Sequence, residues 1–239
     1  MISETQYGAF RGAKLIQQRG VIGGARSVFV KVKGIKNELV YPPFGGKIMN
    51  PPKGQGFKMF AGDLAWFKTD ENGVKPEVYL LKTFEVNSVS EDLNTVGIVK
   101  DAYRHQPCIG DKIGVAPATI GGTMTAGTIT SISVKTESGV EVWSCVVDAA
   151  LTGATKGAIL VEAGSDGKML VKAVNSVLDS DIDLLDAGAT SDEDFDGARY
   201  YYTPALGGIM YTHKMSPLPA CVKTLNQSKI NGWFQIQSV

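Results

Sequence analysis

Residues 128–148 read Thr-Ile-Thr-Ser-Ile-Ser-Val-Lys-Thr-Glu-Ser-Gly-Val-Glu-Val-Trp-Ser-Cys-Val-Val-Asp. The runs 128–135 and 140–148 are rich in β-branched residues, which pack well on a pleated surface. Between them stands Ser138-Gly139, and glycine allows the positive φ that tight hairpin turns require. This stretch predicts two antiparallel strands joined by a short turn.

Three further stretches carry the same signal. Segments 64–67 and 77–86 flank Asn72-Gly73, segments 158–162 and 168–174 flank Asp166-Gly167, and segments 221–225 and 233–237 flank Asn231-Gly232. Four hairpin signals in one chain indicate antiparallel sheets folded as a sandwich or barrel. We therefore expect a mostly β protein with an antiparallel barrel- or sandwich-like core, an extended N-terminal arm and little helix.

A glycine recurs just before several of these predicted strands. It stands in Ala61-Gly62-Asp63-Leu64, Ile109-Gly110-Asp111-Lys112, Ala126-Gly127-Thr128-Ile129 and Lys156-Gly157-Ala158-Ile159. The intervals between the four are unequal, so they do not describe a solenoid repeat. Glycine in front of a strand opens a tight corner, which a small barrel needs repeatedly.

Length and cysteine content set the class of protein. A chain of 239 residues buries a sizeable core without disulfides, and its 28 glycines suit many tight turns. Cys108, Cys145 and Cys221 have no paired spacing, so we expect buried free thiols. No leader pattern and no apolar run long enough for a membrane span is present, and we expect synthesis in a reducing compartment.

Charge divides the chain into two parts. Residues 1–60 hold ten Lys/Arg against two Asp/Glu, a net charge of +8, and the remaining residues balance this at −8. Such asymmetry indicates an interaction tail on a differently charged body, and the alternative is a solvated surface. The predicted domains are a basic arm with one strand at 1–60, a central β domain at 61–178, an acidic loop at 179–199 and a C-terminal β region at 200–239.

The basic arm interleaves cations with aromatic residues, and three interpretations of it stay open. It docks on another protein, it binds nucleic acid by stacking on bases, or it is a plain strand of its own domain. The acidic body would repel a polyanion, and the arm lacks a dense Lys/Arg block, so a protein partner is favoured. The predicted docking residues are Phe10, Arg11, Lys14, Arg19, Arg26, Phe29, Lys31, Lys33, Tyr41 and Phe44.

Catalytic motifs are scarce. The chain has two histidines, too few for a three-histidine metal site in one subunit. Gly45-Gly46-Lys47-Ile48 lacks the first glycine and the Ser/Thr of a phosphate loop. His105 stands three residues before Cys108, but Gln106-Pro107 between them indicates an ordinary loop better than a thiolate–imidazole pair. We expect no enzyme activity and no cofactor.

One acidic segment matches part of a calcium-binding loop. Asp192, Asp194 and Asp196 alternate before Gly197, as in the first half of such a loop, but Thr203 stands where the bidentate carboxylate belongs. A solvated acidic loop is the favoured interpretation and a weak calcium site the alternative. A hydrolase that uses a metal held by these three carboxylates is a further, less favoured hypothesis.

Three segments of the body stand out beside the basic arm: Ala61-Gly62-Asp63-Leu64-Ala65-Trp66-Phe67, Tyr79-Leu80-Leu81-Lys82 and Thr155-Lys156-Gly157-Ala158-Ile159-Leu160-Val161-Glu162. Together with the arm, they resemble the auxiliary, decoration and head-fibre proteins of tailed bacteriophages. The resemblance covers residues 1–175 and concerns the general pattern of the sequence. It implies a β-rich virion protein on the outside of a capsid, often a trimer, with an extended terminus lying on the major capsid protein. It supplies no catalytic residues, and it makes a membrane partner unexpected and nucleic acid unfavoured.

Overall fold

The hairpin predicted from residues 128–148 is the longest strand pair that the structure describes. The structure is a computed structural model, and it describes residues 14–15, 46–51, 58–69, 76–102, 104–178, 182–183, 200–202, 208–211, 216–223 and 234–237. Strands β9 (Ala126–Glu137) and β10 (Val140–Val147) pair antiparallel. Ser138 and Gly139 both have positive φ, 50° and 79°, as a two-residue hairpin turn requires.

Six strands close into an antiparallel barrel, in the order β10, β7, β6, β11, β8, β9. The other four are β6 (Thr83–Val89), β7 (Thr95–Val99), β8 (Lys112–Val115) and β11 (Ile159–Glu162). Two bulges interrupt the ladders, between Val86 and Ser88 in β6 and between Val146 and Val147 in the β9–β10 pair. Bulges bend and twist strands, which helps a sheet close on itself. The expected mostly β fold with an antiparallel barrel core is confirmed.

The barrel encloses an apolar core. Leu160 of β11 faces this core, and its neighbour Val161 belongs to a second cluster outside the barrel. Because successive residues of a strand point to opposite faces, β11 is buried on both sides and joins the two cores. The core is formed by Phe84, Val86, Val96, Ile98, Ile113, Ile129, Cys145, Val147, Leu151, Ala154 and Leu160.

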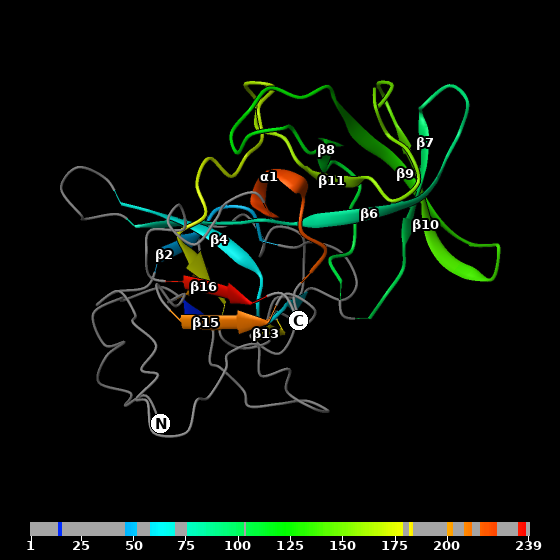
Figure 1. Cartoon of the computed structure of the whole chain (residues 1–239). Coiled ribbons are helices and arrows are strands. Elements are labelled where there is room, and N and C mark those ends of the chain that lie inside the picture. Colours follow the sequence, from blue (N-terminus) through cyan, green and yellow to red (C-terminus); the bar gives the residue numbers. More distant parts are fainter. Residues whose placement is uncertain are drawn as a thin grey trace.

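A second sheet lies beside the barrel in Figure 1. Its six strands run in the order β1, β14, β2, β5, β4, β12. Their bounds are β1 (Lys14–Leu15), β2 (Gly46–Ile48), β4 (Leu64–Lys68), β5 (Glu77–Leu80), β12 (Ser176–Val177) and β14 (Tyr200–Tyr202). The β1–β14 and β2–β5 pairs are parallel and the others antiparallel. The β4–β5 pair confirms the hairpin predicted around Asn72-Gly73.

The second apolar cluster joins this sheet to the barrel. It combines Leu64 of β4 with Val161 of β11, and helix α1 (Ala220–Lys223) adds Cys221 and Val222. Each of these four side chains is at most 3 % exposed. Burial of this kind contributes about 25 cal/mol for each Å² of apolar surface removed from water. Helix α1 is therefore held against the sheet and the barrel.

Three details of the predicted strands were wrong. Segment 77–86 is two strands, because Leu81 and Lys82 leave the sheet and β6 enters the barrel. Residues 168–174 form only isolated bridges at Lys168 and Met169. Segment 221–225 begins in helix α1, because the Pro219 carbonyl accepts hydrogen bonds from the N–H groups of Val222 and Lys223. The partner of β16 (Phe234–Gln237) is instead β15 (Gly208–Tyr211), in parallel.

The described residues of the first sixty include three strands that belong to sheets. Strand β2 lies between β14 and β5, where Ile48 is fully buried, and β1 pairs with β14. Strand β3 (Lys58–Met59) pairs with β13 (Ile182–Asp183), which comes from the segment predicted to be an acidic loop. The predicted strand around Phe29 and most of the expected arm lie outside the described residues.

Candidate functional site

The same turn precedes β4 and β8. In the first, the N–H of Asp63 donates to the Phe60 carbonyl at 3.0 Å, and the Phe60 N–H donates to the Asp63 carboxylate at 2.7 Å. In the second, Asp111 and Cys108 make the same two bonds at 3.1 and 2.9 Å. The third residues, Gly62 and Gly110, have φ of 92° and 90°, which is strained for any residue with a Cβ. The Gly-Asp pair shared by these two segments thus forms a turn in which the carboxylate accepts a hydrogen bond from the backbone N–H three residues earlier.

Asp63 is at the centre of a buried junction. Its carboxylate also accepts a hydrogen bond from the Ser216 hydroxyl at 2.9 Å, and Nε2 of His105 lies 3.1 Å from Oδ2. Asp63 and His105 are 1 % and 2 % exposed, and the imidazole meets the Phe60 ring edge-on at 5.7 Å between centroids. His105 has no hydrogen bond of good geometry to a described residue, so its contact with Asp63 is an ion pair only when protonated.

This junction joins three segments that are far apart in sequence. Asp63 stands before β4 of the sheet, His105 in the loop between β7 and β8 of the barrel, and Ser216 before α1. The serine hydroxyl donates to the carboxylate and not to the imidazole, whereas a nucleophilic serine needs the imidazole as its base. The arrangement stabilises the packing of sheet, barrel and C-terminal segment and does not activate Ser216.

A second set of buried polar side chains lies between the end of β5 and the start of β6. Nζ of Lys82 is 2.8 Å from Oε1 of Glu162, and the side chains are 3 % and 12 % exposed. Asn50 donates from Nδ2 to the Leu80 carbonyl and to Glu162, and its Oδ1 accepts from the Leu80 N–H. Burial opposes the charged form of Lys82, but the negative charges of Glu162 and Asp111 outweigh it and raise the pKa. Lys82 is therefore charged and paired at neutral pH.

The three cysteines are buried thiols that form no disulfide, as expected. Burial raises the pKa of the Cys145 thiol to about 12, and the charges of Asp111 and Cys108 act in the same direction. Burial also raises the pKa of Cys221. A thiol is nucleophilic only as the thiolate, so Cys145 and Cys221 are not poised for attack at neutral pH. Residues 105–108 form a loop, as the sequence indicated, and the Cys108 thiol contacts the Gln106 carbonyl at 3.7 Å.

A half-exposed aromatic pair lies on the β4–β5 hairpin. Trp66 and Tyr79 are cross-strand partners whose rings stack at 5.2 Å, and Nζ of Lys68 lies 5.8 Å from the Trp66 ring. The Tyr79 hydroxyl donates to Glu77 at 3.0 Å, and Lys68 pairs with the same carboxylate at 3.0 Å. Burial, together with Glu77, raises the pKa of Tyr79 to about 12. These polar groups are satisfied by one another, as in a cross-strand contact that stabilises a sheet.

The predicted site residues lie almost entirely outside the described part of the chain. Of the docking residues, only Lys14 falls within it, in β1, where its backbone pairs with Tyr200 of β14. The calcium candidates Asp192, Asp194 and Asp196 also fall outside it. Within the described ranges, no three His, Cys, Asp or Glu side chains are grouped so as to hold a metal ion.

The sequence did not predict the two buried polar groups. The repeated Gly-Asp phrase before β4 and β8 was a usable signal for Asp63 and Asp111. Lys82 and Glu162 gave no signal of their own, because their pairing depends on how the sheet joins the barrel. Ser216 lies 153 residues from Asp63, and nothing local indicates the contact.

Comparisons with known proteins add no further information on the site. No protein-family model matches the chain, and neither do the curated proteins or the solved structures that were searched. No helix in the described ranges is long and apolar enough to cross a membrane.

Proposed function

We propose that this chain is a structural virion protein that docks on the outside of a capsid through its N-terminal arm and stabilises or decorates the shell. The observation that carries the proposal is the charge division of the sequence, +8 in residues 1–60 against −8 in the rest. A basic segment on an acidic body is suited to a negatively charged protein surface. The expected partner is the major capsid protein.

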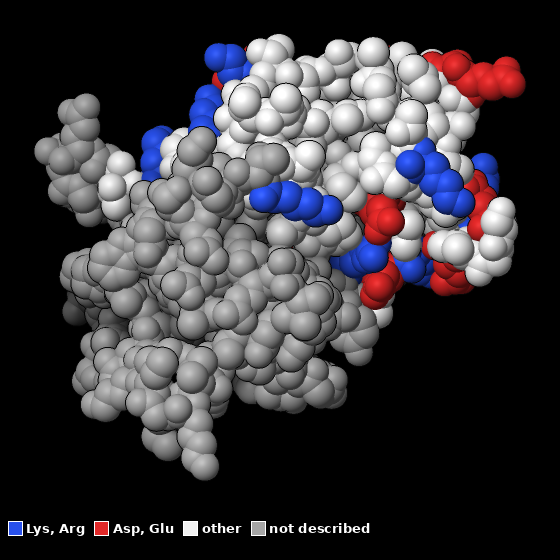
Figure 2. All heavy atoms as spheres, in the orientation of Figure 1, with Lys and Arg blue, Asp and Glu red and all other residues white. Residues whose placement is uncertain are grey.

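The body gives this proposal indirect support. Its buried polar groups, Asp63 with His105 and Lys82 with Glu162, make contacts that join the barrel to the sheet. On the face shown in Figure 2, positive and negative side chains of the barrel are interspersed, without a large patch of one sign. In this proposal, the barrel and the second sheet form the body that the arm attaches to the capsid.

In the proposed mechanism, the aromatic residues of the arm provide the binding affinity and its cations set the association rate. Phe10, Phe29, Tyr41 and Phe44 fill apolar pockets of the partner, because buried aromatic side chains provide most of the binding energy of an interface. The cations steer the encounter and set the orientation, as charges at the rim of an interface do. A Phe29→Ala variant is then expected to dissociate faster, and a variant without Lys31 and Lys33 to associate more slowly.

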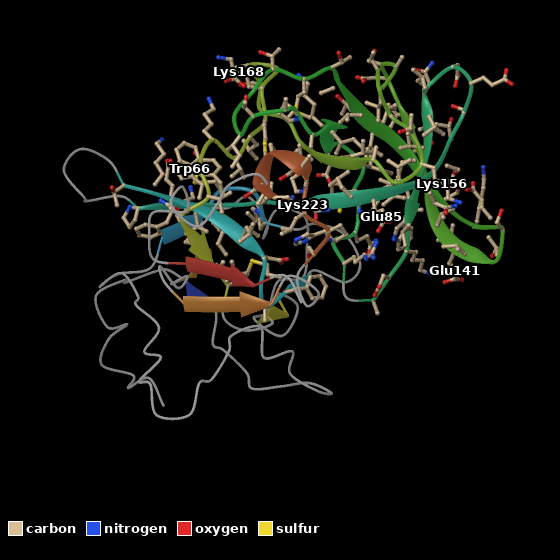
Figure 3. All side chains as sticks on the ribbon, in the orientation of Figure 1. Trp66, Glu85, Glu141, Lys156, Lys168 and Lys223 are labelled. Atoms are coloured by element: carbon tan, nitrogen blue, oxygen red, sulfur yellow. The ribbon has the colours of Figure 1, made fainter. Side chains whose placement is uncertain are left out.

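The fold decides which variants test this proposal. Deleting residues 1–58 would remove β2, an interior strand of the six-stranded sheet, so loss of binding would not be interpretable. Charge reversal avoids this problem. Lys31→Glu/Lys33→Glu changes the net charge by −4, and Lys156→Glu/Lys168→Glu makes the same change at two exposed lysines of the body, labelled in Figure 3.

The experiment has two steps. Mass spectrometry of gradient-purified virus particles from the source is expected to find this chain in a fixed ratio to the major shell protein. Particles lacking the chain are then mixed with purified protein, and the Lys31→Glu/Lys33→Glu variant is expected to bind more slowly than the parent and the Lys156→Glu/Lys168→Glu control. Absence from the particles would overturn the virion role, and equal binding of both variants would overturn the docking role of the arm.

Nucleic-acid binding is the alternative, favoured only by the interleaving of Lys/Arg with aromatic residues in the arm. It predicts binding to a single-stranded oligonucleotide that weakens steeply as salt increases. The same two charge-reversal variants separate the alternatives. An oligonucleotide complex that only Lys31→Glu/Lys33→Glu weakens would replace the capsid proposal, and no binding at low salt would exclude nucleic acid.

A further inference from the structure

Strand β9 has a long unpaired edge. It comprises 12 residues, and β8 pairs with only its first three, Ala126, Gly127 and Thr128. Ile129 continues the contact, because its N–H donates to the Asp111 carbonyl and its carbonyl accepts from the Gly110 N–H. Beyond Ile129, residues 131–137 pair with β10 alone among the described residues, and we call this segment the β9 edge.

The register identifies the backbone groups that are free. Glu137 and Val140 flank the two-residue turn, and residues in that position exchange hydrogen bonds. Hydrogen-bonded and non-hydrogen-bonded pairs alternate along an antiparallel ladder. The N–H and C=O groups of Ile132, Val134 and Thr136 therefore point away from β10 and have no backbone partner among the described residues.

The β9 edge has few of the usual protections against pairing. Proteins guard exposed edges with proline, bulges, charged side chains such as lysine, inward-pointing charges or very short strands. Of these devices, the edge carries the exposed Lys135. Residues 131–137 contain no proline, and the β9–β10 ladder is regular from Ser131 to Glu137. Val134 is 48 % exposed, and its face of the strand also carries Ile132. In Figures 1 and 3 the hairpin projects from the barrel, and Glu141 marks its outer part.

We propose that the β9 edge pairs antiparallel with the same edge of a second copy of this chain, around a two-fold axis at Val134. In this register Val134 meets Val134 of the second copy, and Ile132 lies opposite Thr136. Ile132, Val134 and Thr136 of each copy then lie opposite the same three residues of the other copy. Their outward-facing N–H and C=O groups all form hydrogen bonds across the axis. The most exposed apolar side chain of the hairpin is buried at the centre of the contact.

The edge is complementary to itself, and this argues for a second copy as the occupant. With the axis at Val134, Lys135 lies opposite Ser133 and Glu137 opposite Ser131, so no like charges are directly opposed. An axis one residue along, at Lys135, would place two lysines opposite each other. A two-fold axis also uses one surface twice, as the commonest homodimers do. Val134 stands at the midpoint of residues 131–137, so this register pairs the whole segment.

The proposal is independent of the virion role, because purified protein without particles tests it. Sedimentation velocity of the full-length protein, from micromolar to submillimolar concentration, is expected to show a monomer–dimer equilibrium. Val134→Lys places a charge at the axis and is expected to raise the dimer dissociation constant at least about tenfold. Val140→Lys makes the same exchange at a valine that is 37 % exposed on β10, away from the edge, and should dimerise like the parent.

Hydrogen exchange gives a readout that a general loss of stability would not produce. The amides of Ser133 and Lys135 bond to β10 and should be protected at every concentration. The amides of Ile132, Val134 and Thr136 should gain protection only as the protein is concentrated, and only in the parent and Val140→Lys. A parent that stays monomeric throughout would overturn the proposal, as would a dimer that Val134→Lys does not weaken or whose formation leaves these three amides unprotected.

Discussion

Replacing Lys82 by methionine should be among the most destabilising single changes in the described part of the chain. The Lys82–Glu162 pair is 2.8 Å apart, and its side chains are 3 % and 12 % exposed. At an effective dielectric constant of about 20, charges at that distance attract by about 6 kcal/mol, and the cost of desolvation offsets part of this. Removing one partner leaves Glu162 buried without its counter-charge, so we expect a loss of about 3–5 kcal/mol.

Urea unfolding followed by circular dichroism measures this loss. With an m-value of about 2 kcal/mol per M, the midpoint should fall by about 1.5–2.5 M. Lys68→Met is the matched control, because Lys68 pairs with Glu77 at 3.0 Å but with side chains 46 % and 29 % exposed. An exposed pair contributes about 0–1 kcal/mol, so the control should unfold near the parent.

A double variant tests whether the cost of Lys82→Met comes from the lost counter-charge of Glu162. If the cost of Lys82→Met comes from an uncompensated charge, then Lys82→Met/Glu162→Gln should lose less than the sum of the single changes, by at least about 2 kcal/mol. Strict additivity, or a cost for Lys82→Met no greater than for Lys68→Met, would refute the argument.

Three further predictions follow from the fold. First, the pKa of Lys82 is raised in the folded state, so the charged lysine stabilises the fold below its unfolded pKa of about 10.4. This stabilisation is lost as the pH rises through the folded pKa. In urea titrations at increasing alkaline pH, Lys82→Met should therefore lose less stability than the parent. Second, Gly139 has φ of 79° with nothing within 4 Å of the position that a Cβ would occupy, so Gly139→Ala should cost about 1 kcal/mol through backbone strain alone, and no loss in thermal unfolding would contradict the turn. Third, burial raises the pKa of Cys145 to about 12, so this thiol should resist iodoacetamide in the folded protein at pH 8 and react once urea unfolds it, as peptide mass spectrometry would show.

The predictable part of this fold is the part that depends on local turn chemistry. Ser138-Gly139 indicated the β9–β10 hairpin because both turn residues need positive φ, and the alternating residues beside it need a pleated surface. The β4–β5 pair was found in the same way. In both cases the information lies within about twenty residues, so the sequence alone was sufficient.

Tertiary contacts overrode the local signal elsewhere. Asn231-Gly232 suggested a hairpin, but Cys221 and Val222 instead pack a helical turn against the second apolar cluster. Segment 77–86 reads as one strand, yet it divides at Lys82, whose amine is held by Glu162 some eighty residues away. The Asp63–Ser216 contact spans 153 residues. Sequence patterns do not specify such partners, because neither residue changes the local propensity of its segment.

Strand length explains why a closed barrel still has an open edge. Closure needs each strand to pair on both sides, but β9 has 12 residues and β8 has four, so most of β9 extends past its neighbour. The overhang keeps its alternation, with Ile132 and Val134 on one face beside Trp143 of β10. Lys100 lies 5.2 Å from the Trp143 ring, yet Val134 remains 48 % exposed. Beyond the barrel, β9 is apolar on one face and unpaired at its edge. A second strand would satisfy the free backbone groups of that edge and cover its apolar face. For this reason we regard the length of β9 as a determinant of assembly.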